Sequence, residues 1–192
     1  HLCSCLYCIT DKRIITLDIH SREIENAFGK ANIENLHASY QIIRELSKLF
    51  DLSPNGDDLV IVSPDTGAVD RNKFYATELR NPLVMIYKER DYYVVTQNAK
   101  DTNIKSVKIL GDVKGKVAFL ADDMLGTGGT LLKAMEFLKE QGATKVIAAI
   151  SLPFFTGNAI EQFNAAYEKG LFYRVIGTNA VYHEELLKCE WY

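Results

Sequence analysis

Short apolar runs alternate along the chain with longer segments whose apolar residues recur at helical spacing. Residues 59–62 and 117–121 are continuous apolar runs, which is typical of strands buried on both faces of a sheet. In residues 39–50 the apolar side chains fall on one helical face, and Ser39 is placed to cap that helix. The pattern predicts strands at 13–17, 59–62, 83–87, 117–121, 145–150 and 174–176, and helices from near residue 21 and at 39–50, 69–79, 131–141 and 158–169.

Helices that alternate with apolar strands predict an α/β fold with a doubly wound, mainly parallel sheet and helices on both faces. In open sheets of this kind, ligands bind beyond the carboxyl ends of the strands. Polar residues directly follow the predicted strands at 18–20, 63–68, 88–90 and 122–130. We therefore expect these segments to lie together and to form one site.

Composition narrows the class of protein. The chain has 192 residues, of which 47% are hydrophobic and 24% charged, as expected for a globular protein of one large or two small domains. A formal net charge of −3, with no basic block or basic amphipathic helix, argues against a nucleic-acid or membrane surface. No apolar run reaches the roughly 18 residues of a membrane span, and the first residues lack the order of a signal peptide, so we expect a cytoplasmic protein.

Three cysteines near the start, Cys3, Cys5 and Cys8, form a C-x-C-x-x-C pattern that, together with His1, is compatible with a zinc site. The second cysteine pair of a structural zinc site is missing, and Cys189 lies far away in the sequence. Reduced thiols or a stretch of buried strand explain these residues more simply, and we favour those explanations over zinc.

The segment richest in chemistry follows the apolar run at 117–121. Asp122 and Asp123 come first, and a small, glycine-rich loop then leads into a predicted helix. Gly128 and Gly129 let the backbone approach an anion, and the helix start offers unpaired N–H groups and its positive dipole end. The carboxylates suit vicinal sugar hydroxyls or a hydrated magnesium ion. The alternative is an ordinary turn with capping aspartates, and the segment is neither a P-loop, since no lysine follows the glycines, nor a G-x-G-x-x-G fingerprint.

This segment resembles the phosphoribosyl-diphosphate motif shared by type I phosphoribosyltransferases and ribose-phosphate diphosphokinases. The resemblance implies that Asp122 and Asp123 bind the ribose hydroxyls. It also implies that the 5-phosphate is held by the loop residues Leu125, Gly126, Thr127, Gly128, Gly129 and Thr130. At Gly126 many members of the superfamily carry an acidic residue, and we expect that difference to change rate or specificity rather than to abolish activity.

All of the strand-end segments are similar, in order and approximate spacing, to ribose-phosphate diphosphokinase over residues 11–192. Residues 17–20 resemble its Asp-x-His turn, which implies that His20 helps to hold a magnesium-nucleotide; the alternative is a hydrogen-bonded histidine at a strand end. Residues 63–68 resemble its Ser-Pro-Asp-x-Gly loop. That likeness implies that Asp65, Thr66 and Gly67 approach the diphosphate, with Asp65 near a second magnesium ion, whereas a plain tight turn is the alternative.

Residues 88–90 resemble the basic catalytic loop of the same family. The resemblance implies that Lys88 and Arg90 are catalytic and neutralise the diphosphoryl group during its transfer. The alternative is a solvated cluster of charges on a surface loop. Residues 91–93 and the polar stretch 96–106 are consistent with a mobile lid.

Members of this family usually have two similar α/β domains, and this chain resembles the second of them plus the end of the first. Residues 1–36 are therefore expected to be the remnant of an N-terminal α/β domain, and residues 37–192 a phosphoribosyltransferase-like domain. Contacts to ribose 5-phosphate are better represented than contacts to ATP, so we expect the chain to bind the sugar phosphate more readily. Phe163, Tyr167 and Phe172 are expected to be packing residues.

The function implied by the resemblance is that of a ribose-phosphate diphosphokinase with Mg²⁺ as cofactor. Its substrates are ATP and ribose 5-phosphate, and family members form homo-oligomers in which neighbouring subunits share the nucleotide pocket. A type I phosphoribosyltransferase is the first alternative, against which the basic pair Lys88 and Arg90, His20 and the lack of a nucleobase hood argue. A non-catalytic regulatory subunit is the second, favoured by Gly126 and the missing first domain but not by the retained acidic and basic residues.

Overall fold

A six-stranded sheet forms the centre of the molecule, in the order β5-β4-β3-β6-β7-β8. The computed structural model describes residues 13–21, 23–24, 26, 32–53, 58–90 and 104–192, the side chains of 88–90 and 104–106 excepted. Neighbouring strands of the sheet pair in parallel except β4 and β5, which are antiparallel. This arrangement confirms the predicted mainly parallel sheet. The strands are β3 (Leu59–Ser63), β4 (Leu83–Arg90), β5 (Ile104–Leu110), β6 (Val117–Leu125), β7 (Lys145–Pro153) and β8 (Arg174–Gly177).

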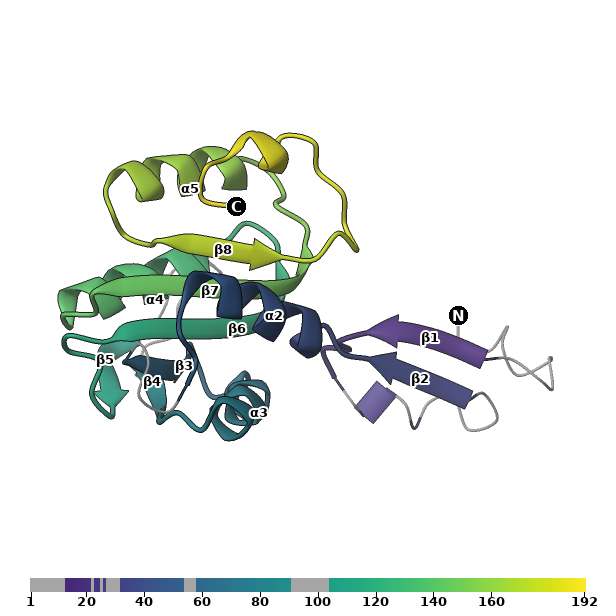
Figure 1. Ribbon diagram of the computed structural model, residues 1–192, viewed down its shortest axis with the longest axis horizontal. Helices are drawn as coiled ribbons and strands as arrows, with labels where there is room; N and C mark the ends of the chain where they lie inside the picture. The colour runs from purple at the N-terminus through teal and green to yellow at the C-terminus, as the bar shows by residue number, and fades with distance from the viewer. Residues whose placement is uncertain (1–12, 22, 25, 27–31, 54–57, 91–103) are drawn as a thin grey trace.

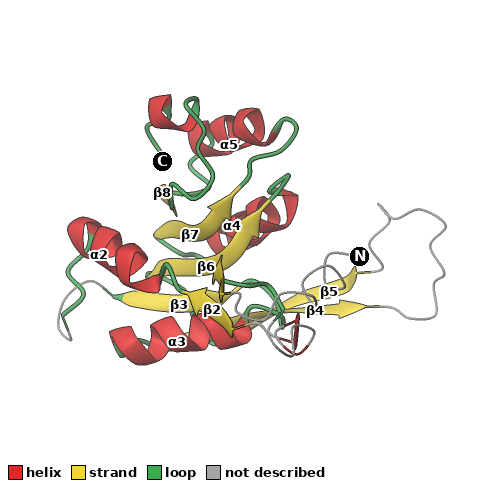
Figure 2. Cartoon of the chain, turned by 90° about the vertical axis from the view of Figure 1, so that its right-hand side faces the viewer, coloured by secondary structure: helices red, strands yellow, loops and turns green. Residues whose placement is uncertain are grey.

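Helices cover both faces of this sheet, as the doubly wound fold requires. Successive strand residues point to opposite faces, so Ile61 and Phe119 belong to one core cluster, whereas Val62 and Leu120 belong to the other. Figure 2 shows α2 and α4 on opposite sides of β6 and β7. β3 is buried at every position because both of its faces are covered. The helices are α2 (Ser39–Leu49) and α3 (Val69–Leu79) over the first cluster, and α4 (Gly129–Glu140) and α5 (Ala159–Glu168) over the second.

A separate two-stranded parallel sheet projects from the body as an arm (Figure 1). It consists of β1 (Arg13–Leu17) and β2 (Asn32–Leu36). Asp18, directly after β1, has φ of 44°, a backbone conformation that Asp and Asn tolerate better than most residues. The chain thus turns at the end of the arm, and Ile19 and His20 lie against the body of the molecule.

The last segment of the chain closes the core on the α5 side. A short 3₁₀ helix, η2 (Leu186–Lys188), leads to Trp191, which is buried against Phe163 and Phe172. Phe163 and Phe172 are core residues as predicted, and Tyr167 packs at the edge of the same cluster.

Most predicted elements are present, with shifted ends. β4, β6 and β7 continue past their predicted ends, and β6 still pairs with β7 at Leu125↔Pro153. The prediction stopped each strand at its first polar residue, whereas ladder pairing uses backbone groups and tolerates polar side chains. Gly142 follows α4 with φ of 90°, the left-handed conformation that glycine adopts readily after a helix.

Some predictions were wrong, and others fall outside the described residues. β2 and β5 were not predicted, and residues 104–106, expected in the lid, belong to β5. Ser39 does not cap α2, because the N-cap is Ala38, whose N–H donates to Oδ2 of Asp18 at 3.1 Å. Two further predictions cannot be compared with the structure. The helix expected from near residue 21 falls mostly outside the described part of the chain, and so do residues 91–93 and 96–103 of the expected lid.

None of the helices in the described part of the chain has both the length and the apolar character needed to cross a membrane.

Candidate functional site

A cavity of about 1130 Å³ gathers segments that are far apart in the sequence. The turn after β1, the start of α3, the end of β6 and the start of α4 all contribute to its wall. Thr66 lies in the turn before α3 but is not among the lining residues. The predicted site residues that line the cavity are His20, Asp65, Gly67, Asp122, Asp123, Leu125, Gly126, Thr127, Gly128, Gly129 and Thr130.

The glycine-rich loop ends in the first turn of α4. Gly128 is the N-cap with φ of 74°, and the first intrahelical bond runs from Leu132 N–H to Gly128 C=O at 2.9 Å. The N–H groups of the preceding helical residues therefore have no intrahelical partner and, with the helix dipole, favour an anion at this point. The loop after β7 braces the segment, because Thr156 N–H donates to Gly126 C=O at 3.0 Å.

The turn between β3 and α3 is organised by Asp65. Its Oδ1 accepts hydrogen bonds from the N–H groups of Gly67 at 2.9 Å and Ala68 at 3.1 Å. The buried Ser63 hydroxyl donates to the carbonyl of Asp65 at 2.7 Å. Asp65 therefore has a structural role in starting α3, besides any role toward a ligand.

Two substitutions separate these roles of Asp65. Asp65→Ala is expected to lower the free energy of unfolding by about 1 kcal/mol, because the two N–H groups of the turn that leads into α3 lose their acceptor. Asp65→Asn keeps a carbonyl acceptor and is expected to change it by less than about 0.5 kcal/mol. Urea denaturation measures both, and equal losses in the two variants would contradict this account.

Asn72 fixes the sheet just before the carboxylates of β6. The ladder between β3 and β6 ends at Val62↔Leu120, which leaves both backbone groups of Ala121 unpaired on that side. The fully buried Asn72 amide of α3 replaces β3 there, since Ala121 N–H donates to its Oδ1 and its Nδ2 donates to Ala121 C=O, both at 2.9 Å. The positions of Asp122 and Asp123 are thus tied to α3.

The pKa values of Asp122 and Asp123 are shifted in opposite directions. Burial, followed by the hydrogen bond and charge of Asp123 and the charge of Asp65, raises the pKa of Asp122 to about 7. Burial also acts to raise the pKa of Asp123, but hydrogen bonds from Asp122 and His20 and the charge of Arg71 outweigh it and lower that pKa. Asp123 is therefore the ionised partner, and the half-buried Asp122 is the more readily protonated one.

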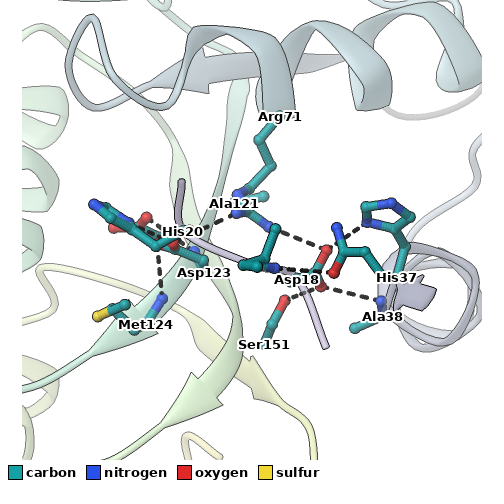
Figure 3. A network of polar contacts seen from close by, with 12 residues as sticks. Asp18, His20, His37, Ala38, Arg71, Ala121, Asp123, Met124 and Ser151 are labelled. Carbon is teal, nitrogen blue, oxygen red and sulfur yellow. Dashed lines mark hydrogen bonds and ion pairs between the residues drawn. The ribbon is translucent and has the colours of Figure 1, made fainter. Parts of the chain in front are cut away.

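A chain of polar side chains crosses the wall of the cavity (Figure 3). His20 Nδ1 lies 2.6 Å from Asp123 Oδ2, and His37 Nδ1 lies 2.8 Å from Asp18 Oδ1. The guanidinium of Arg71 lies between the two pairs, 3.3 Å from Asp18 Oδ1 and 3.7 Å from Asp123 Oδ2. Asp18 Oδ2 also accepts a 2.5 Å hydrogen bond from the hydroxyl of Ser151 on β7. Asp18 therefore joins the arm, α3 and the central sheet.

A family model described as a phosphoribosyl transferase domain matches residues 29–184 of this sequence. The chain belongs to the phosphoribosyl transferase domain family. That range includes the Asp65 turn and the entire loop of β6 and α4, so the family match covers most of the cavity wall.

Two curated relatives and one solved structure show which members of the family this chain is similar to. Ribose-phosphate pyrophosphokinase A of Dictyostelium discoideum is 38% identical over 178 residues, which are 92% of this chain and 50% of that protein. Ribose-phosphate pyrophosphokinase of Wolinella succinogenes is 37% identical over 170 residues, 88% of this chain and 49% of that protein. The crystal structure of phosphoribosylpyrophosphate synthetase from Mycobacterium smegmatis matches with a TM-score of 0.70 and 29% identity, over 88% of this chain and 49% of that one. The chain thus spans about half the length of these relatives.

The donors in this family member fit a magnesium ion that is held mainly by phosphate and water. Among the described residues, no group of three or more His, Cys, Asp or Glu side chains is arranged to hold a metal ion. Mg²⁺ commonly takes only one or two protein ligands and completes its shell with substrate phosphates and water. Asp65 keeps its Oδ2 free of hydrogen bonds from described residues. His20 faces Asp123 Oδ2 through Nδ1 at 2.6 Å, so Nε2 is the ring nitrogen turned away from that contact and the one that could meet a ligand.

The remaining predicted residues are placed only in part. Lys88 and Arg90 belong to strand β4 rather than to a loop, with backbone partners Val107 and Ile104 on β5. Their side chains, like Cys3, Cys5 and Cys8, lie outside the described part of the molecule. Their proposed catalytic role therefore stays a prediction.

Sequence reasoning missed the residues that hold the site together. Arg71, Asn72, His37 and Ser151 were not singled out, because each sits in an ordinary helix, strand or connecting segment and gains its meaning from contacts across the fold. The sequence does hint at Arg71 and Asn72. These two polar residues lie near the start of the helix predicted at 69–79, directly after the loop at 63–68 that was predicted to bind a ligand.

Proposed function

We propose that this chain carries the ribose-phosphate site of a Mg²⁺-dependent ribose-phosphate diphosphokinase. The reaction transfers the diphosphoryl group of ATP to the anomeric hydroxyl of ribose 5-phosphate and yields 5-phosphoribosyl 1-diphosphate and AMP. The observation that carries the proposal is the single cavity that joins the start of α4, the two carboxylates of β6, the Asp65 turn and His20. The names of the relatives support the reaction, and the chemistry of the cavity supports the class of ligand.

Each wall of the cavity suits one part of the substrates. The N–H groups at the start of α4 bind the 5-phosphate together with Thr127 and Thr130, and Asp122 and Asp123 accept hydrogen bonds from the ribose hydroxyls. The turn of Asp65, Thr66 and Gly67 is proposed to approach the diphosphate, with Asp65 and Gly67 on the cavity wall and Thr66 between them in the turn. When bound, Mg²⁺ supplies positive charge that offsets repulsion between phosphates and carboxylates, with Asp65 and His20 as its protein ligands.

The transfer itself needs fixed positive charge more than covalent help. The anomeric oxygen of ribose 5-phosphate bonds to the β-phosphorus of ATP, the bond from that phosphorus to the oxygen bridging to the α-phosphorus breaks, and AMP leaves with the electron pair. The hydroxyl proton is released to solvent. Because the transition state is loose and its charge lies on phosphate oxygens, Lys88 and Arg90 are proposed to stabilise it.

The experiment that tests this function is ³¹P NMR of the purified chain with ATP, ribose 5-phosphate and magnesium. Joint appearance of AMP and a new sugar diphosphate is the expected result. Failure of both products to appear, while the ribose 5-phosphate resonance still shifts on addition of protein, would favour a regulatory subunit or a site that needs further residues. Consumption of 5-phosphoribosyl 1-diphosphate with a nucleobase, and no reaction with ATP, would favour a type I phosphoribosyltransferase instead.

Lys88→Ala is expected to depress turnover strongly, by about a hundredfold or more, while leaving the affinity for ribose 5-phosphate nearly unchanged. A cation that acts on the diphosphoryl group in flight contributes to the transition state and little to sugar-phosphate binding. Initial rates and calorimetric titration with ribose 5-phosphate measure the two effects. A parallel loss of affinity would make Lys88 a substrate anchor.

We further propose that the boundary between residues 1–36 and 37–192 separates parts of two domains, and that subunits assemble into homo-oligomers in the cytoplasm. The arm's own two-stranded sheet, distinct from the central one, supports the boundary. The family resemblance supports the assembly.

A further inference from the structure

Arg71 is the cation that the buried carboxylates of the cavity wall share. It belongs to α3, and its side chain is 22% exposed, whereas those of Asp18 and Asp123 are 6% and 5% exposed. Nη1 faces Asp18 Oδ1 at 3.3 Å and Nη2 faces Asp123 Oδ2 at 3.7 Å. Figure 3 shows the guanidinium reaching down between the two carboxylates. Two buried negative charges without this cation would be costly.

These two carboxylates come from different parts of the molecule. Asp123 lies on β6 in the central sheet, and Asp18 follows β1 of the arm. Asp18 is anchored by the Ala38 N–H and the Ser151 hydroxyl, so its carboxylate is a fixed point. His20, two residues further on, meets the same Asp123 oxygen as Arg71.

We propose that Arg71 is a positioning residue of this site: it ties the Asp123 carboxylate to the Asp18 carboxylate and thereby keeps His20 and Asp123 in place on the cavity wall. Arginine suits this role because its planar fork presents two nitrogens to two acceptors, which a lysine ammonium cannot do in the same geometry. The effect on ligand binding rests on the proposed function, whereas the tie between arm and sheet does not.

Arg71→Lys is the informative substitution, because it keeps the positive charge and removes the fork. The matched control is Arg44→Lys on α2, where the guanidinium is exposed and lies 3.7 Å from Glu45. Amide hydrogen exchange of residues 13–17 and 32–36 reports on the arm, and calorimetric titration with ribose 5-phosphate reports on the site. Both are measured well below the melting temperature of each variant, so that global unfolding does not contribute.

We expect Arg71→Lys to accelerate exchange in the arm by about tenfold and to weaken ribose 5-phosphate binding by about tenfold, with no change in Arg44→Lys. Asp18→Asn is expected to have a similar effect on arm exchange, and the double variant Asp18→Asn with Arg71→Lys to add little to it, because both act through one tie.

Three outcomes would overturn the proposal. One is unchanged arm exchange in both Arg71→Lys and Asp18→Asn; another is full additivity in the double variant. The third is a lower melting temperature with unchanged arm exchange and unchanged affinity, which would leave Arg71 only a structural role. If the unmodified chain does not bind ribose 5-phosphate, the proposed function fails, and arm exchange alone still decides whether Arg71 ties the arm to the sheet.

Discussion

Replacing Asp18 with alanine is expected to lower the free energy of unfolding by about 3–5 kcal/mol, because the substitution leaves a largely buried Arg71 without its nearer carboxylate. The Ser151 hydroxyl and the Ala38 N–H lose their acceptor in the same step. Alanine also tolerates the φ of 44° at this position poorly. Thermal unfolding should show a melting temperature about 10 °C lower, and urea denaturation the corresponding loss.

Asp18→Asn and Asp112→Asn are the controls for this prediction. Asparagine tolerates the left-handed backbone and keeps one acceptor oxygen, so Asp18→Asn should be milder than Asp18→Ala. Within the described part of the chain, the exposed Asp112 accepts one hydrogen bond, at 3.0 Å from Lys114 N–H, and its substitution should change stability by less than about 0.5 kcal/mol. An Asp18→Ala cost no larger than that of Asp112→Asn would contradict the role of Asp18 as the junction of arm and sheet.

The contribution of the Asp18 carboxylate to the free energy of unfolding depends on pH. Burial acts to raise its pKa, but hydrogen bonds from Ser151, His37 and Ala38 and the charge of Arg71 outweigh burial and lower the pKa below its usual 3.8. A carboxyl group with a depressed pKa in the folded state contributes stability above its unfolded pKa and loses it as pH falls through the folded value. The stability gap between the unmodified chain and Asp18→Asn should therefore be full at neutral pH and narrow below about pH 4.

Local pattern was sufficient for most of the central fold. The continuous apolar runs of β3 and β6 and the one-sided face of α2 follow directly from burial, and α3 was predicted with its observed bounds. β2 was missed because its sequence, Asn32–Leu36, is short and largely exposed, so its strand state comes from pairing with β1. β5 was missed for a similar reason, as an edge strand paired on one side to β4.

The sequence motifs predicted most of the residues that line the cavity, but not the residues that hold those motifs in place. The glycine loop, the Asp65 turn and His20 are contiguous motifs, and the cavity does bring them together. The contacts of Arg71 with Asp18 and Asp123, and of Asn72 with Ala121, join residues separated by 49 or more positions. Only the three-dimensional packing pairs them. Ser39 illustrates the same limit, since the acceptor at the start of α2 is the distant Asp18.

Gly128→Ala is expected to destabilise the fold by about 3 kcal/mol through two separate effects. With φ of 74°, the position disfavours any residue that carries a Cβ. A Cβ placed there would also lie 2.4 Å from Cε2 of Phe163, a fully buried ring. Phe163 cannot move aside easily, because the rings of Phe155, Phe172 and Trp191 surround it with centroids 5.3, 5.6 and 5.5 Å away. Differential scanning calorimetry measures the loss.

Substitutions at two other glycines, Gly157 and Gly129, allow the cost of the backbone conformation at Gly128 to be separated from the cost of the contact with Phe163. Gly157 has φ of 66°, and a Cβ at that position would meet nothing within 4 Å, so Gly157→Ala should cost about 1 kcal/mol for the backbone alone. Gly129 opens α4 with no such conformation and equally open space, so Gly129→Ala should be neutral or slightly stabilising. The excess cost at Gly128 then measures the contact with Phe163. A cost at Gly128 equal to that at Gly157 would mean that the glycine-rich loop yields freely and that Phe163 does not position it.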